Sequence, residues 1–346
     1  MRIRRTLPIA LAVVIVAAAV TLAVQLRKHA PPEPARLLPG ADAFVYANFG
    51  WIRKLNPNPF PRVSHDPEYE RFIQESGFEF EKDLDKVAFA IHYPESWPGG
   101  GTGGSAPEPR FSEVFVGKFD GEKLAAYLRH EAKSIENYES VDIFSIPIEG
   151  RTFRVAILNV DAVAASNHND PAVIRGIVDR SRRLASPFAG PAFLRKYYKH
   201  VQLASPVWAV ARVTRMMALS APWVALDRPA DLVVSASYNP LHLPLRTGAL
   251  HLRAEAWTAS DDDARAVVDK MNVFLTMFHS AEASVGSAGT DADVKALFDS
   301  LQVRQEDRRA VLLATVPTGV FKKLVESPPQ AAAPEDAVPE SASKKH

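Results

Sequence analysis

Apolar and polar residues alternate in short runs along the chain, a pattern that predicts half-buried β-strands. The clearest run is 250–257, in which every second residue from Leu250 to Ala256 is apolar. We expect one face of this strand to be buried and the other to be solvated. Similar runs predict strands at 43–49, 86–93, 114–116, 144–149, 153–157, 161–166, 206–213, 230–238 and 309–316.

Between these runs, apolar residues recur every three or four positions, which predicts amphipathic helices. Several helices have recognisable starts: Asp66 precedes a proline that suits the first helical position, and Asp120 and Asp170 stand before helical runs in the same way. Ser260 and Asp263 form a capping box for the longest helix. The predicted helices begin near 67, 121, 171, 193, 260, 294 and 321, and the second of them is expected to extend to Ile135.

The order of these elements predicts an α+β fold made of two tandem modules, 41–203 and 204–326. We expect each module to be an antiparallel sheet with helices packed on one face. A strand followed by a long amphipathic helix occurs at 111–135 and again at 250–279, and this likeness of pattern suggests an internal duplication.

Almost every residue between Leu7 and Leu26 is apolar, and basic residues flank the run on both sides. A helix of twenty residues spans roughly 30 Å, the thickness of a bilayer core. The run therefore predicts an N-terminal transmembrane helix, with 1–28 as a basic cytoplasmic tip and anchor and the bulk of the chain outside the cytoplasm. A cleaved signal peptide is the alternative, but Arg27 and Lys28 close the run like the far end of a membrane span.

The segments around the modules have the composition of linkers and tails. Residues 29–40 contain four prolines and predict a semi-rigid spacer, and the proline-rich stretch 56–67 and the glycine-rich stretch 97–110 predict loops. Residues 327–346 are rich in alanine, proline, glutamate and serine, and we expect them to be a disordered tail.

Charge and cysteine content exclude two classes of function. The 346-residue chain has a net charge of +1, but five of its basic residues lie before His29, which leaves 36 basic against 40 acidic residues in the rest. This balance is wrong for a general nucleic-acid-binding protein, whose affinity comes largely from neutralising phosphates. The absence of cysteine excludes disulfides and an anchor attached through a lipid-modified cysteine.

Motifs for known chemistries are incomplete. His130 and Glu131 begin the H-E-x-x-H pattern of zinc proteases, but Ser134 stands where the second histidine is required. The glycines at 99, 101 and 104 fit a dinucleotide-binding pattern, but prolines rather than a helix follow them. Residues 261–263 are aspartates without the spacing of a calcium loop. We predict no catalytic residue, no cofactor and no metal ion.

One polar cluster remains at 167–170, where His168 and Asp170 are suited to hold a divalent ion or to position a water molecule. Asp170 is also placed to cap the helix that follows. A histidine beside a capping residue is usually only solvated, so the capping interpretation is favoured.

Two segments are candidate interaction surfaces. The first is a basic, aromatic stretch that suits the anionic surface of the membrane, or that packs its aromatic residues on the sheet and leaves its cations in water. The second is the apolar connector 216–226, which is too short to span a membrane and suits a buried interface or a protein partner. The residues concerned are Arg180, Arg182, Arg183, Arg195, Lys196, Tyr197 and Lys199 in the first segment, and Met216, Met217 and Trp223 in the second.

Four runs resemble a broad group of membrane-anchored bacterial envelope proteins of unknown function with repeated α+β modules: LLPGADAFVYANF, GKFDGEKLAAYL, VDIFSIPIEGRTFRVAILNVDAVAAS and DPAVIRGIVDR. The resemblance covers 37 to about 200 and implies a location outside the cytoplasm, but it supplies no catalytic residues. The expected function is that of a single-pass inner-membrane protein that binds a ligand or an envelope protein partner without catalysis. The alternatives are an envelope hydrolase with a site at the module boundary and a lipid-associated protein at the membrane surface.

Overall fold

The computed structural model describes residues 30–55, 66–93, 109–182, 190–213, 228–239, 249–284 and 292–317. Several predicted features lie outside these residues: the apolar segment 7–26, most of the two loops, Arg183, the connector 216–226 with Met216, Met217 and Trp223, the short helix at 321–325 and the tail. None of the helices in the described ranges has the length and hydropathy needed to cross a membrane.

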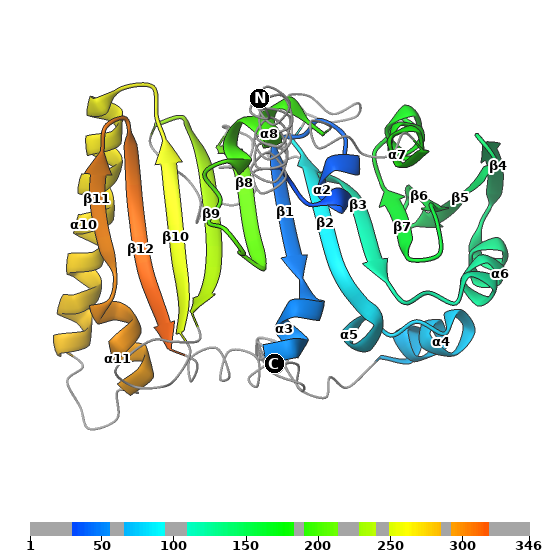
Figure 1. The fold of residues 1–346 in the computed structure, drawn as a ribbon, viewed down its shortest axis with the longest axis horizontal. Helices are drawn as coiled ribbons and strands as arrows, with labels where there is room; N and C mark the ends of the chain where they lie inside the picture. The colour runs from blue at the N-terminus through cyan, green and yellow to red at the C-terminus, as the bar shows by residue number, and fades with distance from the viewer. Residues whose placement is uncertain are drawn as a thin grey trace, which may run out of the picture.

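The described strands form one twelve-stranded antiparallel sheet in the order β11-β12-β10-β9-β8-β1-β2-β3-β7-β6-β5-β4 (Figure 1). The short strands β4 and β11 are its two edges. The strands are β1 (Ala43–Asn48), β2 (Leu84–His92), β3 (Arg110–Gly117), β4 (Ser134–Tyr138), β5 (Val141–Ile148), β6 (Arg151–Ile157), β7 (Ala162–Ser166), β8 (Val207–Val213), β9 (Ala230–Asn239), β10 (Ala249–Trp257), β11 (Gln302–Glu306) and β12 (Arg309–Pro317).

The helices are α2 (Glu33–Leu37), α3 (Phe49–Leu55), α4 (Pro67–Ser76), α5 (Phe80–Asp83), α6 (Gly121–Glu131), α7 (Ala172–Arg182), α8 (Ala192–Tyr198), α10 (Asp261–Ser284) and α11 (Ala292–Asp299). The predicted caps are confirmed. Asp66 accepts a hydrogen bond from the Tyr69 amide at 2.8 Å, and Asp120 accepts one from the Lys123 amide at 3.1 Å. Ser260 accepts from the Asp263 amide at 3.1 Å and starts α10 as expected.

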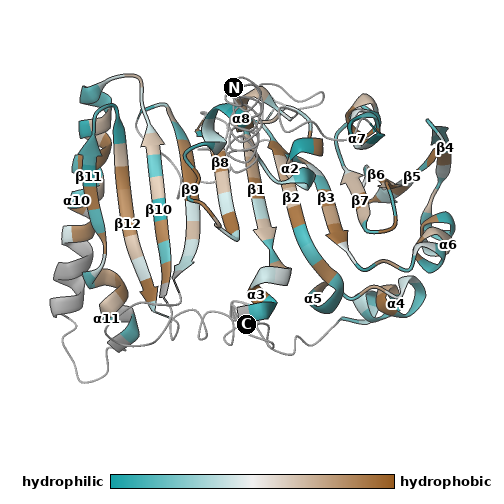
Figure 2. Ribbon diagram, in the orientation of Figure 1, coloured by the Kyte–Doolittle hydropathy of each residue, from teal (hydrophilic) through white to brown (hydrophobic). Residues whose placement is uncertain are grey.

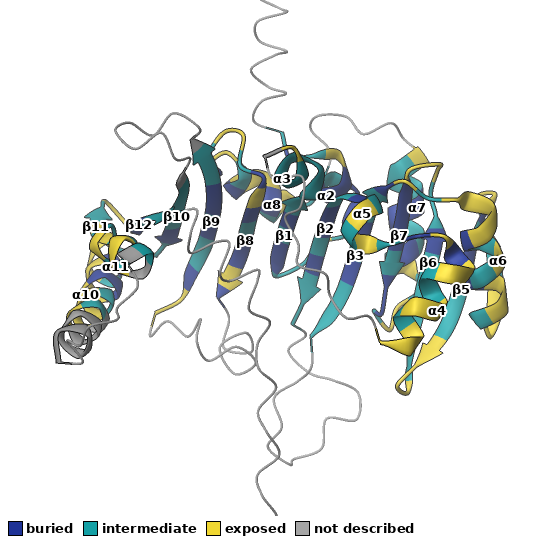
Figure 3. Ribbon diagram, turned by 90° about the horizontal axis from the view of Figure 1, so that it is seen from below, coloured by how far each residue is buried: buried dark blue, intermediate teal, exposed yellow. Residues whose placement is uncertain are grey.

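Helices cover both faces of the sheet. Successive side chains of a strand point to opposite faces, so the residues that contact a helix show which face it covers. On the first face, which carries Phe44 of β1, the helices α2, α7 and α8 pack over the centre of the sheet. On the second face, which carries Ala43, α6 packs against Phe144 and Val163, and α10 packs against Ala256. The prediction of helices on one face only is therefore wrong, since each face of the sheet has its own buried apolar clusters. Figure 2 shows hydrophobic residues along the strands and on the helices. Buried residues follow the central strands, whereas α4 and α6 at the periphery are largely exposed (Figure 3).

The two predicted modules share this sheet. The strands of 41–203 and those of 204–326 form its two halves, which meet where β1 pairs with β8 from Ala43↔Ala211 to Ala47↔Val207. The α+β class with antiparallel pairing is confirmed, but the two sheets expected from the sequence are a single one. Most residues of β1 and β8 are apolar on both faces. The pairing of the two strands satisfies the backbone N–H and C=O groups along the edge that each would otherwise expose.

Local predictions failed at four places. The spacer predicted at 29–40 contains α2, whose residues Ala35 and Leu37 are buried in the core beneath α7. The helix expected to reach Ile135 ends at Glu131, and Ile135 lies in the edge strand β4 with 47% of its surface exposed. The strand β11 was not predicted, because QVRQE lacks a marked alternation. Glu255, expected on a solvated face of β10, is only 3% exposed.

Gly117 gives a direct test of how tightly the first half is packed. A Cβ atom at this position would collide with the carbonyl oxygen of Asp83 and would lie 3.2 Å from the Leu84 Cα. We expect Gly117→Ala to lower the free energy of unfolding by about 1–3 kcal/mol, because the backbone of the neighbouring strand has to move. Gly121→Ala is the control, since a Cβ at Gly121 meets nothing within 4 Å and this glycine starts α6. Equal stability of the two variants in urea titrations would contradict the packing described here.

Candidate functional site

A row of polar and aromatic side chains crosses four neighbouring strands, β8, β9, β10 and β12, at one end of these strands. Arg212 of β8 pairs with Asp231 of β9, Asp231 pairs with Trp257 of β10, and Trp257 pairs with Arg309 of β12. All four residues therefore project from the same face, the first face that α8 covers. The row continues to the start of β1, because the Arg212 amide donates to the carbonyl oxygen of Asp42 at 2.7 Å.

A cleft of about 1050 Å³ lies between this row and α8. It is formed by the end of α8, the ends of the four strands and the turn between β11 and β12. The site thus lies at the predicted boundary between the two modules. Its charged and aromatic lining residues are Lys196, Tyr197, Lys199, His200, Arg212, Asp231, Trp257, Glu306, Asp307, Arg308 and Arg309.

Trp257 is the centre of the cleft's aromatic wall. Its ring centroid lies 4.2 Å from that of His200 and 6.2 Å from that of Tyr197, and the Arg309 guanidinium lies 5.0 Å from it. The indole Nε1 is buried and has no hydrogen-bond acceptor in the described part of the chain. This wall combines a flat apolar surface with an adjacent cation, an arrangement that suits an aromatic or unsaturated group.

A buried ion-pair network holds Arg309 in place. Glu255 is only 3% exposed and accepts from the Arg253 Nε at 2.6 Å and from the Arg309 Nη1 at 3.1 Å. Glu306 accepts from the Arg309 Nη2 at 2.6 Å. Arg309 is thereby fixed over Trp257, and its charge is largely compensated by two carboxylates.

Asp231 is engaged in a similar way. It accepts a hydrogen bond from the Tyr197 hydroxyl, and its other oxygen lies 3.7 Å from Nε of Arg212. Burial, followed by the hydrogen bond to Asp231, raises the pKa of Tyr197. The pKa of Lys196 is raised by its hydrogen bond to Tyr197, so this lysine is cationic at neutral pH.

The cleft has an excess of positive charge. Its lining contains five lysine or arginine residues and three acidic residues. Asp231 is paired with Arg212, Glu306 is paired with Arg309, and Asp307 lies in the turn between β11 and β12. Lys199 and Arg308 make no ion pair with any described residue. An anionic group in this cleft would therefore find two uncompensated cations beside an aromatic wall.

The described lining of the cleft contains few hydroxyl groups. The lining hydroxyl groups among the described residues belong to Tyr197 and Thr258, and the Thr258 hydroxyl is hydrogen-bonded to the Arg308 and Ser260 carbonyl oxygens, each at 2.9 Å. Burial lowers the pKa of His200, and within the described ranges no carboxylate is hydrogen-bonded to this histidine. Among the described residues of the lining, no hydroxyl group is thus paired with a base.

The structure brings only some of the predicted surface residues together. Lys196, Tyr197 and Lys199 line the cleft. Tyr197 and the neighbouring aromatic residues pack toward the sheet, as the alternative interpretation of this stretch expected. Arg180 donates to the Leu37 carbonyl at 2.6 Å and ties α7 to α2, so its role is structural.

Arg182 and Arg195 are exposed and do not line the cleft. Sequence reasoning missed Arg212, Asp231, Trp257, Arg308 and Arg309, which come from separate strands and turns. Only the strand register could have placed these five residues side by side.

The polar cluster predicted around His168 borders a buried network: the half-buried His168 donates its amide to the Ser166 hydroxyl at 3.2 Å, and its ring centroid lies 5.1 Å from that of His92. His92 lies 3.2 Å from the Ser112 hydroxyl, which lies 3.0 Å from the Ser166 hydroxyl. Ser112 is fully buried and Ser166 is 3% exposed, so neither hydroxyl is accessible to a substrate. Asp170 accepts from the Ala172 amide at 2.8 Å, which confirms its role as a cap.

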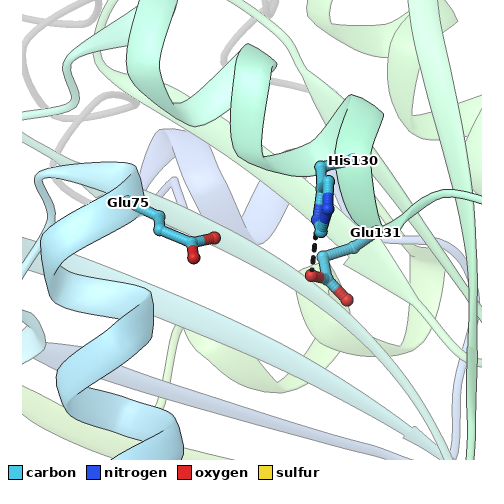
Figure 4. Close-up of side chains that lie close together, drawn as sticks. All are labelled: Glu75, His130 and Glu131. Carbon is cyan, nitrogen blue, oxygen red and sulfur yellow. Dashed lines mark hydrogen bonds and ion pairs between the residues drawn. The ribbon is translucent and has the colours of Figure 1, made fainter.

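A second group of potential ligands lies where α4 meets α6. Glu75, His130 and Glu131 place one ligand atom each within 4.8 Å of one another (Figure 4). However, Arg71 donates to Glu75 at 2.8 Å and to Glu131 at 3.1 Å. The arginine compensates both carboxylates, so the group is a surface ion-pair cluster.

A second, smaller hollow of about 500 Å³ lies at the opposite end of the strands. It is also basic, since its lining contains Lys54, Lys82, Lys86 and Lys118 together with Arg53, which is paired with Asp85. Trp51 is the one aromatic residue among its described lining residues and makes an edge contact with Tyr238, with ring centroids 5.7 Å apart, whereas Trp257 has His200, Tyr197 and Arg309 around it. The larger cleft is therefore the better binding site, and the smaller hollow offers a matched control.

No protein-family model and no curated protein matches the chain. Among solved structures, the chain is similar to crystal forms III, I and IV of TP0453, with TM-scores of 0.45, 0.42 and 0.40 and sequence identities of 8%, 8% and 9%. These comparisons cover 86% of this chain and 97% or 98% of TP0453. At such low identities they assign no function.

His92 makes stability depend on pH. Burial, together with the nearby His168, lowers the pKa of His92 from 6.5 to about 4. As the pH falls, the unfolded chain takes up this proton before the folded chain does. The contribution of neutral His92 to the free energy of unfolding is therefore complete above pH 6.5 and decreases by up to about 3 kcal/mol as the pH falls toward 4. We expect His92→Gln, which can still hydrogen-bond to Ser112, to lose this dependence. Parallel stability curves of the variant and the parent chain between pH 7 and 4.5 would contradict this assignment.

Glu113 has the opposite effect. This side chain of β3 lies on the second face, and burial raises its pKa from 4.5 to about 7. The folded state therefore keeps the proton up to a higher pH than the unfolded state does, and the free energy of unfolding decreases as the pH rises from 4.5 to 7. We expect Glu113→Gln to be more stable than the parent chain at pH 8, by up to about 3 kcal/mol, and to gain much less at pH 4.5. Chemical unfolding at the two pH values measures the difference.

Proposed function

We propose that this protein is a membrane-anchored binding protein whose cleft holds a ligand that joins an anionic group to a flat or apolar part. The observation that carries this proposal is the position of Lys199 and Arg308, two uncompensated cations beside the wall of Trp257. The cations suit the anionic group, and the indole suits the apolar part.

Binding is favoured over hydrolysis by the state of the polar groups. The acids Glu255 and Glu306 hold arginines, and Asp231 accepts from Tyr197. These three carboxylates are thus engaged in positioning their neighbours, whereas the side chain of Asp307 in the turn makes no hydrogen bond or ion pair with any described residue. The hydrolase alternative, with a site at the same boundary, would require a base that these contacts leave free.

The location follows from the N-terminal sequence. We propose that the segment from Leu7 to Leu26 is a single-pass anchor in a bacterial inner membrane and that the sheet lies outside the cytoplasm. The resemblance to membrane-anchored envelope proteins supports this placement. A protein partner for the connector 216–226 remains part of the same proposal.

The strand order supports an internal duplication. In the first half, β3 leads into α6 and the chain returns with β7 beside β3; in the second half, β10 leads into α10 and the chain returns with β12 beside β10. On the first face, α7 packs on β6 and β7, whereas the returning strand β12 carries Arg309 and its ion-pair network. We propose that the cleft arose from this difference between the halves.

The soluble probe 4-nitrophenyl phosphate tests the cleft, because it is flat, anionic and releases a coloured product if it is hydrolysed. We expect the full chain in phosphatidylcholine nanodiscs to bind it without turnover, and Lys199→Ala/Arg308→Ala to weaken binding at least about tenfold, since each charge-assisted contact contributes about 1.5 kcal/mol or more. Calorimetric titration measures the affinity.

The control variant is Lys86→Ala/Lys118→Ala, which removes the same charge from the smaller hollow at the opposite end of the strands. Loss of binding in this variant, with binding retained in Lys199→Ala/Arg308→Ala, would place the site elsewhere. Steady release of 4-nitrophenol that stops in the cleft variant would favour the hydrolase alternative.

A further inference from the structure

We propose that the anionic group bound by the cleft is the phosphate of an anionic lipid headgroup in the same membrane that holds the chain's N-terminal segment. This inference rests on the proposed function and adds the source of the ligand. Free phosphate esters share the chemistry of the headgroup, and the experiment below separates the two sources.

The cleft lies close to the point where the described chain enters the sheet. The row that lines the cleft begins beside Asp42, which accepts from the Arg212 amide at 2.7 Å and leads directly into β1. Only β8 and β9 separate β1 from β10, which carries Trp257. At about 4.8 Å between neighbouring strands, the aromatic wall lies roughly 14 Å from the start of β1.

The helix α2 connects this edge to the N-terminal segment. An added Cβ at Gly190, just before α8, would lie 3.2 Å from the Arg36 Cα of α2, so the two helices are close neighbours. Figure 1 shows α2 and α8 near the same end of the central strands, with α3 at the opposite end. The cleft and α2, through which the described chain enters the fold, therefore lie at the same end of the strands.

The length of the connection limits how far this edge can lie from the membrane. Six residues lie between Leu26 and Glu33, the first residue of α2, which makes seven steps along the backbone. Fully extended, they reach at most about 25 Å. With 7–26 in the bilayer, the edge that carries Lys199 and Arg308 stays within reach of the headgroup layer, and tethering raises the local lipid concentration far above that of a soluble ligand.

The chemistry of the lining suits this position. Lys196, Lys199 and Arg308 are exposed cations, which an anionic membrane surface attracts. Trp257 and Tyr197 are the residue types that favour the boundary between headgroups and acyl chains. The smaller hollow, lined by five basic residues and one acidic residue, is more positive than the cleft but lies at the opposite end of the strands, so the proposal predicts that the two sites respond differently to lipid.

The experiment uses the absence of cysteine from the chain, which gives single-cysteine variants no background labelling. A fluorophore is attached at Ala259→Cys, on the exposed rim of the cleft, or at Lys54→Cys on α3 at the opposite edge. The full chain is placed in nanodiscs of phosphatidylcholine, with or without one third phosphatidylglycerol, that contain lipids spin-labelled at the headgroup. Quenching of the fluorophore reports its approach to the headgroups.

We expect phosphatidylglycerol to increase quenching at position 259 at least about twofold and to leave position 54 unchanged. Adding Lys199→Ala/Arg308→Ala should abolish the increase, whereas Lys86→Ala/Lys118→Ala should preserve it. Equal quenching in both lipid compositions, or an unchanged increase in the cleft variant, would overturn the proposal. Thermal unfolding of each variant confirms that the fold is intact.

A parallel arm adds sn-glycerol 1-phosphate or inorganic phosphate to the phosphatidylcholine nanodiscs. If the cleft binds these soluble phosphates or 4-nitrophenyl phosphate while phosphatidylglycerol has no effect, the lipid source is wrong and the binding cleft stands. If the cleft binds neither lipid nor soluble ester, the proposed function fails together with this inference.

Discussion

The pairing of β1 with β8 is the constraint on which the molecule depends. Each strand is the inner edge of one half of the sheet, and an unpaired apolar edge in either half would expose a row of unsatisfied backbone groups. Their antiparallel pairing satisfies both edges at once and places buried side chains such as Tyr46 and Trp208 in stacked contact, 5.4 Å apart. The first face of both halves thereby becomes one continuous core.

The cleft is a consequence of this continuity. Arg212, Asp231, Trp257 and Arg309 form a row only because four strands keep a common register from the central pair outward. The buried carboxylate of Glu255 accepts hydrogen bonds from Arg253 and Arg309 and so holds Arg309 in this row. Burying the carboxylate is unfavourable, and the two arginines compensate its charge. A binding surface made of side chains from distant parts of the chain is in this way held by the rigidity of a sheet.

Local chemistry could be predicted from the sequence, and long-range pairing could not. The caps at Asp66, Asp120 and Ser260 depend on hydrogen bonds within three residues, and the structure confirms them. The union of the halves depends on β1 and β8, whose alternation identifies them as strands but not as partners. For the same reason α8 was recognised as a candidate surface, while Arg309, which faces it in the cleft, was not.

The two outer edges of the sheet have a consequence for association between molecules. Both β4 and β11 are five residues long and carry ion pairs, Glu136 with Arg175 at 2.7 Å and Arg304 with Glu306 at 2.8 Å. Short, charged edges discourage a strand of another molecule from adding to the sheet. Charges on a solvated edge are screened when the Debye length falls to about 3 Å in molar salt. The barrier to edge-to-edge self-association is therefore electrostatic, and it weakens as ionic strength rises.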